Sequence, residues 1–462
     1  MLGSATLVAL ALHAAPTLDS GSVAGTLMSQ AQESKGAYAL LTDLVDQVGP
    51  RLSGSKGAEA AVAWAMAQFT AFGLHPRKEP VLVPVWVRGI EEGEVVSAPG
   101  RRKQMLALTA LGGSPGTPKG GLEADVIEVS SLAQLQERGA AVKGRIVFFN
   151  HSMAVASDYG RFGELRTKGP AAAAKLGAVG ALVRSLATAS IRSPHTGQTQ
   201  FNKGEVAIPS AAVSTEDAEL LHRLTVVGPV RVRLVLGCRL LPEAMSSNVV
   251  ADLPGREHPE EIVLLGAHLD SWDLAVGAQD DGAGVALVLE TARLLSSLKE
   301  RPRRTVRFVL FMNEENGLRG AKTYASAHAA ELAQHVAAME LDEGAGRPIG
   351  VALKAGAGAS SLVDAWLPPL VSVGAGTLLH QDAGGADLTP MASAQVPLVS
   401  VVQDATHYFD IHHSSGDTLD KVDPDAFSRT SAAVTWVTYA LAESRAVLPR
   451  PEAPAPSGPA AQ

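Results

Sequence analysis

The sequence predicts an α/β protein with a mainly parallel, mixed sheet that has helices on both faces, together with an inserted β-rich domain. Apolar strand-like runs alternate with helical stretches over residues 243–448, which is typical of a parallel sheet covered on both sides. Shorter strands and helices follow one another over residues 116–242, which indicates a separate, inserted domain. Residues 21–115 then form the N-terminal part of the first domain. The tail, residues 449–462, is rich in proline and alanine and is expected to be disordered.

The composition fits a folded globular protein and narrows the classes of partner. The 462 residues are 46% hydrophobic and 19% charged, which is too apolar for a disordered chain. The formal net charge of −8 argues against a general nucleic-acid binder, which normally has a basic surface. Cys238 is the only cysteine, so an internal disulfide and a cysteine-based zinc site are both excluded. Any bound metal must be held by histidine, aspartate and glutamate.

The first 20 residues contain a short apolar run followed by small residues, which resembles a secretory signal peptide. The pattern is incomplete because no lysine or arginine precedes Lys35. An ordinary N-terminal segment, or a start codon placed too late, would explain the same residues. On the first interpretation the protein is secreted or periplasmic. No stretch of 18 or more apolar residues indicates a helix that spans a membrane.

Helical spacing of apolar residues predicts helices over residues 36–48 and 58–72, separated by Gly49 and Pro50. Val81–Val87 is predicted to be a strand, and Pro84 indicates that this strand lies at a sheet edge. Within the inserted domain, strands are expected over residues 125–129, 145–149, 181–184 and 230–236. In the last third of the chain we expect strands that end at Ala267, Met312, Leu341 and Val402, and helices over residues 282–298, 318–335 and 426–442.

Polar side chains follow the ends of these last strands. They are His268, the pair Glu314 and Glu315, Asp342, and His413, while Asp280 stands at the start of a helix within the stretch GAHLDSWDLAVGAQDDGAG, residues 266–284. In open α/β sheets, ligands bind beyond the carboxyl ends of the strands, and a helix N-terminus favours a carboxylate. The strand assignments therefore bring two histidines and several carboxylates to one rim of the sheet.

This inventory suits two zinc ions that share one bridging carboxylate. Zinc binds imidazole nitrogen and carboxylate oxygen at about 2.0–2.2 Å. Two such ions about 3.5–4 Å apart can activate one water molecule and stabilise the oxyanion that forms. Neighbouring residues on an extended loop point in different directions, so one of Glu314 and Glu315 can bind metal while the other acts as general base. Asp270 follows His268 closely enough to orient its ring.

Each of these residues has an ordinary explanation when it is taken alone. A histidine after a strand is usually structural, Asp280 and Asp281 can cap a helix, and paired glutamates can form a charged loop. The joint occurrence of all of them at strand ends favours a metal site. We expect His407 and His412 to have loop roles or to support the ligands without contacting metal, whereas Trp272 and Asp273 could shape the wall of the site or only pack.

With these motifs in view, the chain resembles the co-catalytic zinc exopeptidases, a family that includes bacterial secreted aminopeptidases and plasma glutamate carboxypeptidases, and it is most similar to the latter branch. The similar stretches occur in order over most of residues 36–448 and are specific as a set: RLSGS, AHLDSWD, GAQDDGAG, RTVRFVLFMNEENG, MELDEG and HHSSGDT. Residues 116–242 resemble the protease-associated domain that many members carry, through VKGRIVFFN, KLGAVGALV and IPSAAVS. The resemblance implies the zinc-exopeptidase fold, with an inserted domain that lies over or beside the active site.

The resemblance also implies a role for each residue. One zinc would be held by His268 and Asp342, the other by Glu315 and His413, with Asp280 as the bridge. Glu314 would be the general base, Asp270 would orient His268, and Asp281 would bind no metal. HHSSGDT replaces the commoner Tyr-His-Thr form, and Tyr408 is a candidate to take the place of that tyrosine.

We therefore expect a dizinc exopeptidase that hydrolyses short peptides or dipeptides through a metal-bridged hydroxide, and the resemblance implies a homodimer. Manganese or cobalt could use similar ligands. Three alternatives remain. An aminoacylase-like dizinc amidohydrolase would use the same metal chemistry, and a catalytically inactive, receptor-like binding protein would lack some ligands, although none is missing here. A structural protein built on the protease-associated fold would leave residues 266–284 unexplained.

Overall fold

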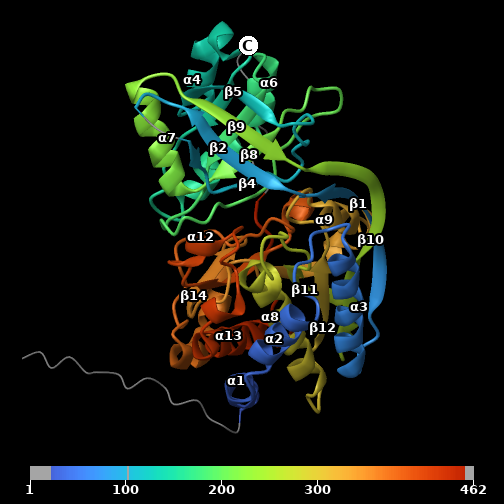
Figure 1. Cartoon of the computed structure of the whole chain (residues 1–462). Helices are drawn as coiled ribbons and strands as arrows, with labels where there is room; N and C mark the ends of the chain where they lie inside the picture. Colours follow the sequence, from blue (N-terminus) through green and yellow to red (C-terminus); the bar gives the residue numbers. More distant parts are fainter. Residues whose placement is uncertain (1–21, 101–102, 453–462) are drawn as a thin grey trace, which may run out of the picture.

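The computed structural model describes residues 22–100 and 103–452. Its strands form one sheet of seven strands and one of eight, and each sheet lies in its own body with its own helices (Figure 1). We call residues 22–90 and 239–452 the main domain and residues 91–238 the inserted domain. The predicted fold class, an α/β protein with a mixed sheet and a second β-rich domain, is confirmed. The expected signal segment lies outside the described residues.

The seven-stranded sheet of the main domain is parallel in the middle and antiparallel at its edges. Across the sheet its strands are β1 (Arg77–Val87), β10 (Arg239–Leu253), β12 (Arg304–Phe311), β11 (His258–His268), β13 (His335–Glu340), β15 (Leu398–Gln403) and β14 (Pro348–Lys354). β12, β11, β13 and β15 run parallel to one another. β1 is the end strand of this sheet and pairs with β10, which places Pro84 at a sheet edge as predicted.

Helices cover both faces of this sheet. On one face α3 (Lys56–Ala71), α8 (Ala283–Ser296) and α13 (Pro424–Glu443) pack against the strands, and α1 (Val23–Ser34) and α2 (Gly36–Gln47) lie against α8 and α13. On the other face α9 (Arg319–Ala327) packs with Leu388 and Met391. Successive side chains of β11 point to opposite faces of the sheet. Val263 and Leu265 pack in the larger core under α3, α8 and α13, and Leu264 packs in the smaller core under α9.

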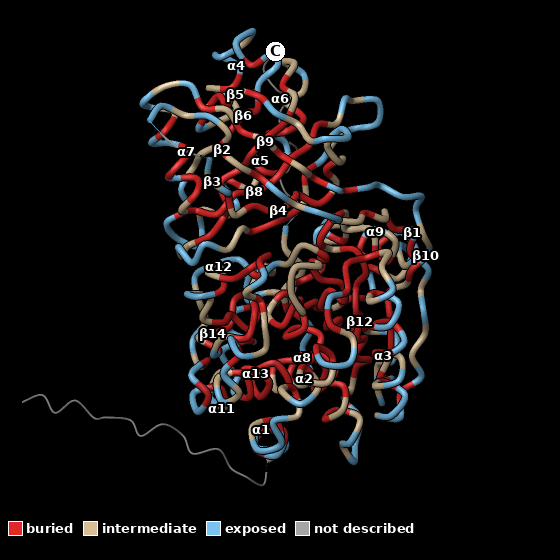
Figure 2. Tube along the Cα trace, viewed as in Figure 1, coloured by how far each residue is buried: buried red, intermediate tan, exposed pale blue. Residues whose placement is uncertain are grey.

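The inserted domain has its own sheet and its own buried cores, which Figure 2 shows as a second buried region. Its strands in spatial order are β3 (Gln104–Met105), β2 (Glu91–Ser97), β9 (Arg231–Leu236), β5 (Leu122–Val129), β6 (Ile146–Phe149), β7 (Gly180–Arg184), β8 (Ser210–Val213) and β4 (Leu108–Ala110). Its helices are α4 (Leu132–Arg138), α5 (Asp158–Thr167), α6 (Gly169–Lys175) and α7 (Thr215–Val227). Three strands of this sheet, β2, β3 and β4, precede the boundary expected at residue 116.

Two antiparallel strands connect the domains. The chain leaves the main domain after β1 and returns along β10, whose first half extends the pairing with β1 beyond the rest of the sheet (Figure 1). The aromatic rings of Trp86 and Trp272 belong to the main domain by sequence but pack within a core of the inserted domain. The two domains are therefore joined by packed side chains as well as by the chain.

Two predictions about elements need correction. The helix expected over residues 318–335 ends at Ala327, because β13 begins at His335 and pairs there with Ile262, so the chain must turn back within a few residues. The tail expected to be disordered from residue 449 is held at its start. The main-chain oxygen of Pro449 accepts a hydrogen bond from the N–H of Gly356, and Arg450 donates to the carbonyls of Ala394, Ala333 and His335. None of the described helices is both long enough and apolar enough to cross a membrane.

Candidate metal centre

His268 stands at the carboxyl end of β11, in the middle of the parallel strands. Its ring is buried, and Nδ1 lies 2.9 Å from the main-chain oxygen of Asp270. Nδ1 then carries the proton, and Nε2 keeps a lone pair for a metal. Nε2 lies 3.1 Å from Asp280 Oδ1 and 3.6 Å from Asp342 Oδ1, so three potential ligands surround one point.

Asp280 lies between two histidines. Its Oδ1 faces His268, and its Oδ2 lies 3.1 Å from His413 Nε2. The loop that carries Asp280 is held by Asp417, whose two carboxylate oxygens accept hydrogen bonds from the N–H groups of Gln279 and Asp280 at 2.7 and 3.1 Å. One carboxylate with an imidazole at each oxygen is the arrangement expected of a bridging ligand.

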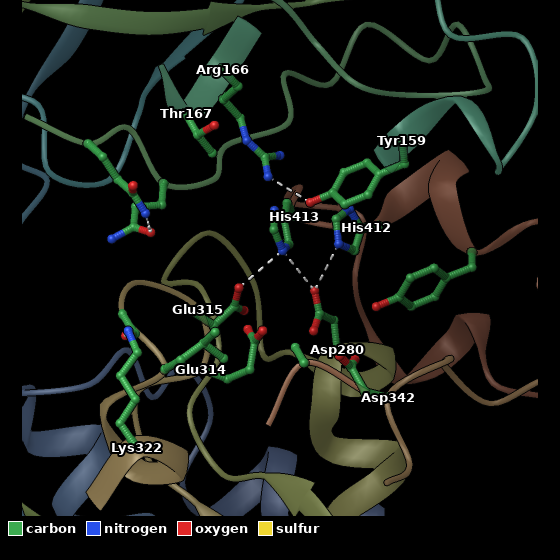
Figure 3. A pocket seen from close by; sticks show the side chains of 16 residues that line it. Tyr159, Arg166, Thr167, Asp280, Glu314, Glu315, Lys322, Asp342, His412 and His413 are labelled. Carbon is green, nitrogen blue, oxygen red and sulfur yellow. Dashed lines mark hydrogen bonds and ion pairs between the residues drawn. The ribbon is translucent and has the colours of Figure 1, made fainter. Parts of the chain in front are cut away.

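The second histidine has its own carboxylate. His413 Nε2 lies 3.0 Å from Glu315 Oε2, and the other oxygen of Glu315 accepts a hydrogen bond from the N–H of Trp272 at 3.0 Å. Figure 3 shows Glu315, His413 and Asp280 converging on one point of the cavity. Two candidate ligand groups thus share Asp280, one with His268 and Asp342 and one with His413 and Glu315.

Glu314 faces the same cavity, which has a volume of about 350 Å³. Its main-chain N–H and that of Asn313 donate to Oδ1 of Asp270 at 3.1 and 2.7 Å. The carboxylate of Asp270 therefore holds the loop of Glu314 and does not orient His268, which is the role that we expected for it. The main-chain carbonyl of Asp270 contacts the imidazole instead, because the chain turns away from the strand directly after His268.

Burial and the repulsion between neighbouring carboxylates shift the pKa values of the side chains in the site. Burial, together with the charge of Asp280, raises the pKa of Glu315 to about 7. Burial also raises the pKa of Glu314 and Asp342. Burial alone would lower the pKa of His268, but the carboxylates of Asp342 and Asp280 outweigh it and raise that pKa well above its ordinary value. So many carboxylates in one buried cavity need compensating positive charge.

The residues present fit divalent metal ions. They offer imidazole nitrogen and carboxylate oxygen, the donor types of zinc sites without cysteine. Two groups of these donors have ligand atoms within 4.8 Å of one another: Asp280, His412 and His413 in one, and His268, Asp281 and Asp342 in the other. Asp281 belongs to its group by position, but both its oxygens accept main-chain hydrogen bonds, from His268 N and Gly284 N.

Further residues line the cavity beside the candidate metal ligands, and two of them, Tyr159 and Arg166, were not predicted. His412 stacks on His413 with ring centroids 3.6 Å apart, and its Nε2 lies 3.4 Å from Asp280 Oδ2. The histidine pair in HHSSGDT was the only sequence signal that His412 lies beside the candidate ligands. Tyr159 and Arg166 reach the cavity from the inserted domain, and no motif indicated them (Figure 3). Tyr408, expected to replace a tyrosine, also lines the cavity.

Comparison with known proteins agrees with this geometry. Residues 248–438 match the family described as Peptidase family M28. Carboxypeptidase Q of Homo sapiens is 37% identical over 435 residues, which cover 93% of this chain and 91% of the relative. The crystal structure of a peptidase M28 precursor from Shewanella amazonensis superposes with a TM-score of 0.89 at 39% identity, over 93% of this chain and 98% of that chain.

A more distant structure shares the fold. BSAP, a zinc aminopeptidase from Bacillus subtilis, has a TM-score of 0.66 at 22% identity, over 89% of this chain and 96% of that chain. The resemblance found in the sequence motifs is thus confirmed along nearly the whole chain. The chain belongs to peptidase family M28 and is a metallo-exopeptidase similar to carboxypeptidase Q.

Proposed function

We propose that this protein is a dizinc exopeptidase that hydrolyses short peptides, dipeptides among them. The observation that carries the proposal is the position of Asp280 between His268 and His413, each of which has a further carboxylate beside it. His268 and Asp342 would hold one ion, and His413 and Glu315 the other. When bound, the two ions would polarise the scissile carbonyl as Lewis acids and acidify a water molecule.

Glu314 would move the proton. Its carboxylate lines the cavity beside the candidate ligands, and two main-chain hydrogen bonds to Asp270 fix the loop on which it stands. It would take a proton from the attacking water and give it to the nitrogen of the leaving amine. Burial raises the pKa of Glu314, which suits a group that must hold a proton between these two events.

The positively charged side chains that line the cavity favour a substrate with a free carboxyl end. Apart from the candidate ligands, Glu314 and the histidines, the charged residues that line it are Arg166 and Lys322. Arg166 is buried and donates to the carbonyl of Thr196 and the hydroxyl of Tyr159, at 3.1 and 2.7 Å. In the described part of the chain no carboxylate forms an ion pair with Arg166. A buried guanidinium has five N–H donors and needs an anion, and the terminal carboxylate of a peptide is that anion.

One set of experiments tests the zinc chemistry. The zinc-replete wild-type protein should contain two ions per chain and hydrolyse dipeptides. Glu314→Gln should keep both ions and lose about 10²–10⁴-fold in kcat, because general base catalysis has that size. Near wild-type turnover of Glu314→Gln would refute its role as base. Hydrolysis of N-acylated amino acids in place of dipeptides would favour an aminoacylase-like amidohydrolase, and zinc content without hydrolysis would favour a binding protein.

A second comparison tests recognition of the carboxyl end. Wild-type kcat/KM should be about 10-fold to 100-fold higher for a dipeptide than for its C-terminal amide, since a hydrogen bond to a charged group contributes about 1.5–3 kcal/mol. Arg166→Gln should remove that preference, mainly through KM. Arg161→Gln is the matched control, because Arg161 lies on the same helix, α5, but is exposed and does not line the cavity. Equal hydrolysis of acid and amide by the wild type would contradict the assignment.

A further inference from the structure

The inserted domain contacts one of the candidate metal ligands directly. The main chain of Thr196 pairs with His413 in both directions. The N–H of Thr196 donates to the main-chain oxygen of His413 at 2.8 Å, and the carbonyl of Thr196 lies 3.4 Å from Nδ1 of the His413 ring. One residue of the inserted domain therefore contacts both the backbone and the imidazole of this ligand.

These contacts decide how His413 presents its ring. With Nδ1 directed at a carbonyl, the proton is on Nδ1, and the lone pair of Nε2 faces Glu315 and Asp280. The backbone of His413 has a φ of +59°, a left-handed conformation that a residue with a side chain adopts only when its surroundings hold it there. The hydrogen bond from Thr196 stabilises this backbone conformation from outside the loop of His413.

Thr196 is itself fixed within the inserted domain. It is fully buried, and its hydroxyl donates to the carbonyl of Ala110 at 2.8 Å. Its carbonyl also accepts a hydrogen bond from Arg166. The next residue, Gly197, passes so close to Arg166 that a Cβ there would overlap the guanidinium. The position of the Thr196 carbonyl is thus set by its own domain.

The two domains also meet elsewhere around the metal centre. The ring of Trp272 fits against Gly112 of the inserted domain, where a Cβ would overlap it, and lies 5.8 Å from the ring of His413. Thr188 donates its hydroxyl at 2.6 Å to Asp410, which lies in the short helix α12 (Tyr408–Ile411) just before His413. These contacts keep the inserted domain in one position relative to the His413 loop.

The histidine of the other candidate site is oriented from within the main domain. His268 Nδ1 contacts the carbonyl of Asp270, which belongs to its own loop in the main domain. The two histidines are therefore oriented in the same way, by a carbonyl at Nδ1, but from different domains.

We propose that Thr196 is a positioning residue for His413, so that the inserted domain sets the zinc affinity of one of the two sites and leaves the other unchanged. This inference rests on the proposed dizinc function. It assigns to the inserted domain a part in metal binding, beyond covering the cavity.

The test is a zinc titration of the metal-free protein against a competing chelator, with zinc as the probe. Thr196→Val keeps the shape of the side chain and removes the hydroxyl that anchors it to Ala110. Thr196→Ser keeps that hydroxyl and is the matched control. Loss of a group that orients a ligand typically costs 10–100-fold in metal affinity. We expect Thr196→Val to weaken one of the two sites by about 10-fold, the other site to be unchanged, and Thr196→Ser to match the wild type.

A second variant tests the main chain. Thr196→Pro removes the N–H that donates to His413, and its expected loss at the same single site is larger, toward 100-fold. The thermal midpoint of each metal-free variant shows that it is folded. Unchanged affinity at both sites in folded Thr196→Val and Thr196→Pro would overturn this inference, as would equal loss at both sites. A wild-type protein that binds fewer than two zinc ions would instead overturn the proposed function.

Discussion

At the scale of single residues, the role of a side chain depends on which of its atoms faces the site. Asp270 is the clearest case. Its place two residues after His268 predicts an orienting role, and it does contact that ring, but through its main-chain carbonyl. Its carboxylate instead accepts hydrogen bonds from Asn313 and Glu314. Sequence spacing identifies the residue, whereas the direction of the chain after the strand decides the atom.

Asp270 variants should therefore affect turnover more than metal binding. Asp270→Ala removes the acceptor that fixes the Glu314 loop, and misplacement of a catalytic group by about 1 Å can cost about 10²-fold in rate. Zinc should stay bound at both sites, because His268 keeps its carbonyl partner. Asp270→Asn keeps an acceptor oxygen and should recover most of the activity. Metal analysis and kcat measured together check this, and selective loss of zinc from Asp270→Ala would contradict it.

His335 gives a prediction about stability and pH. It is fully buried, its Nε2 lies 2.8 Å from the hydroxyl of Tyr324, and burial lowers its pKa from 6.5 to about 4. The unfolded chain therefore takes up this proton first, and stability falls as the pH drops from about 6.5 toward 4. At pH 5 the loss from this residue is about 2 kcal/mol.

The measurement compares the thermal midpoint of the metal-free protein at pH 7.5 and pH 5. The decrease between these pH values should be clearly smaller in His335→Gln, which cannot be protonated, than in the wild type. Equal decreases in the two proteins would show that His335 is protonated in the folded state as easily as in the unfolded one.

At the scale of elements, the loop between β11 and α8 carries Asp280, the proposed bridging carboxylate, and hydrogen bonds from Arg51 hold this loop in place. This fully buried arginine from the RLSGS motif donates to the carbonyls of Leu269, Val276 and Gly277 at 2.8, 2.6 and 3.0 Å. Asp417 holds the same loop further along through Gln279 and Asp280. The loop is thus fixed by residues far from it in sequence.

Removal of Arg51 should loosen that loop. Arg51→Met leaves several buried carbonyls without a donor and should cost about 3 kcal/mol or more in stability. It should also weaken zinc binding, because Asp280 follows the loop. Arg319→Met is a suitable control, since Arg319 is partly exposed and pairs with Glu243 at the surface, where an ion pair contributes at most about 1 kcal/mol. A thermal midpoint of Arg51→Met as high as that of the control would contradict this role.

The sequence predicts most elements because their signals are local. The carboxyl ends of four strands, predicted at Ala267, Met312, Leu341 and Val402, were located to within one residue, since each follows a buried apolar run and precedes polar residues. The helix expected to reach residue 335 was too long, because only the pairing of His335 with Ile262 shows where the strand must begin. Two of the first strands of the inserted sheet, β2 and β4, were missed for the same reason, as their partners β9 and β8 lie far along the chain.

At the scale of the whole molecule, the site is formed by both domains. The candidate ligands and Glu314 come from the carboxyl ends of the main sheet, and their motifs indicated them. The contacts of Thr196, Arg166 and Tyr159 with the site come from the inserted domain. Nothing in their local sequence predicts these contacts, because they depend on how the two domains meet.

The central claim is that Asp280 bridges two metal ions. Its most direct test is a crystal structure of the zinc-replete protein with an anomalous difference map at the zinc absorption edge. We expect two peaks about 3.5–4 Å apart, one beside His268 and Asp342, the other beside His413 and Glu315, with Asp280 contacting both. A single peak, or two peaks that do not share Asp280, would contradict the account.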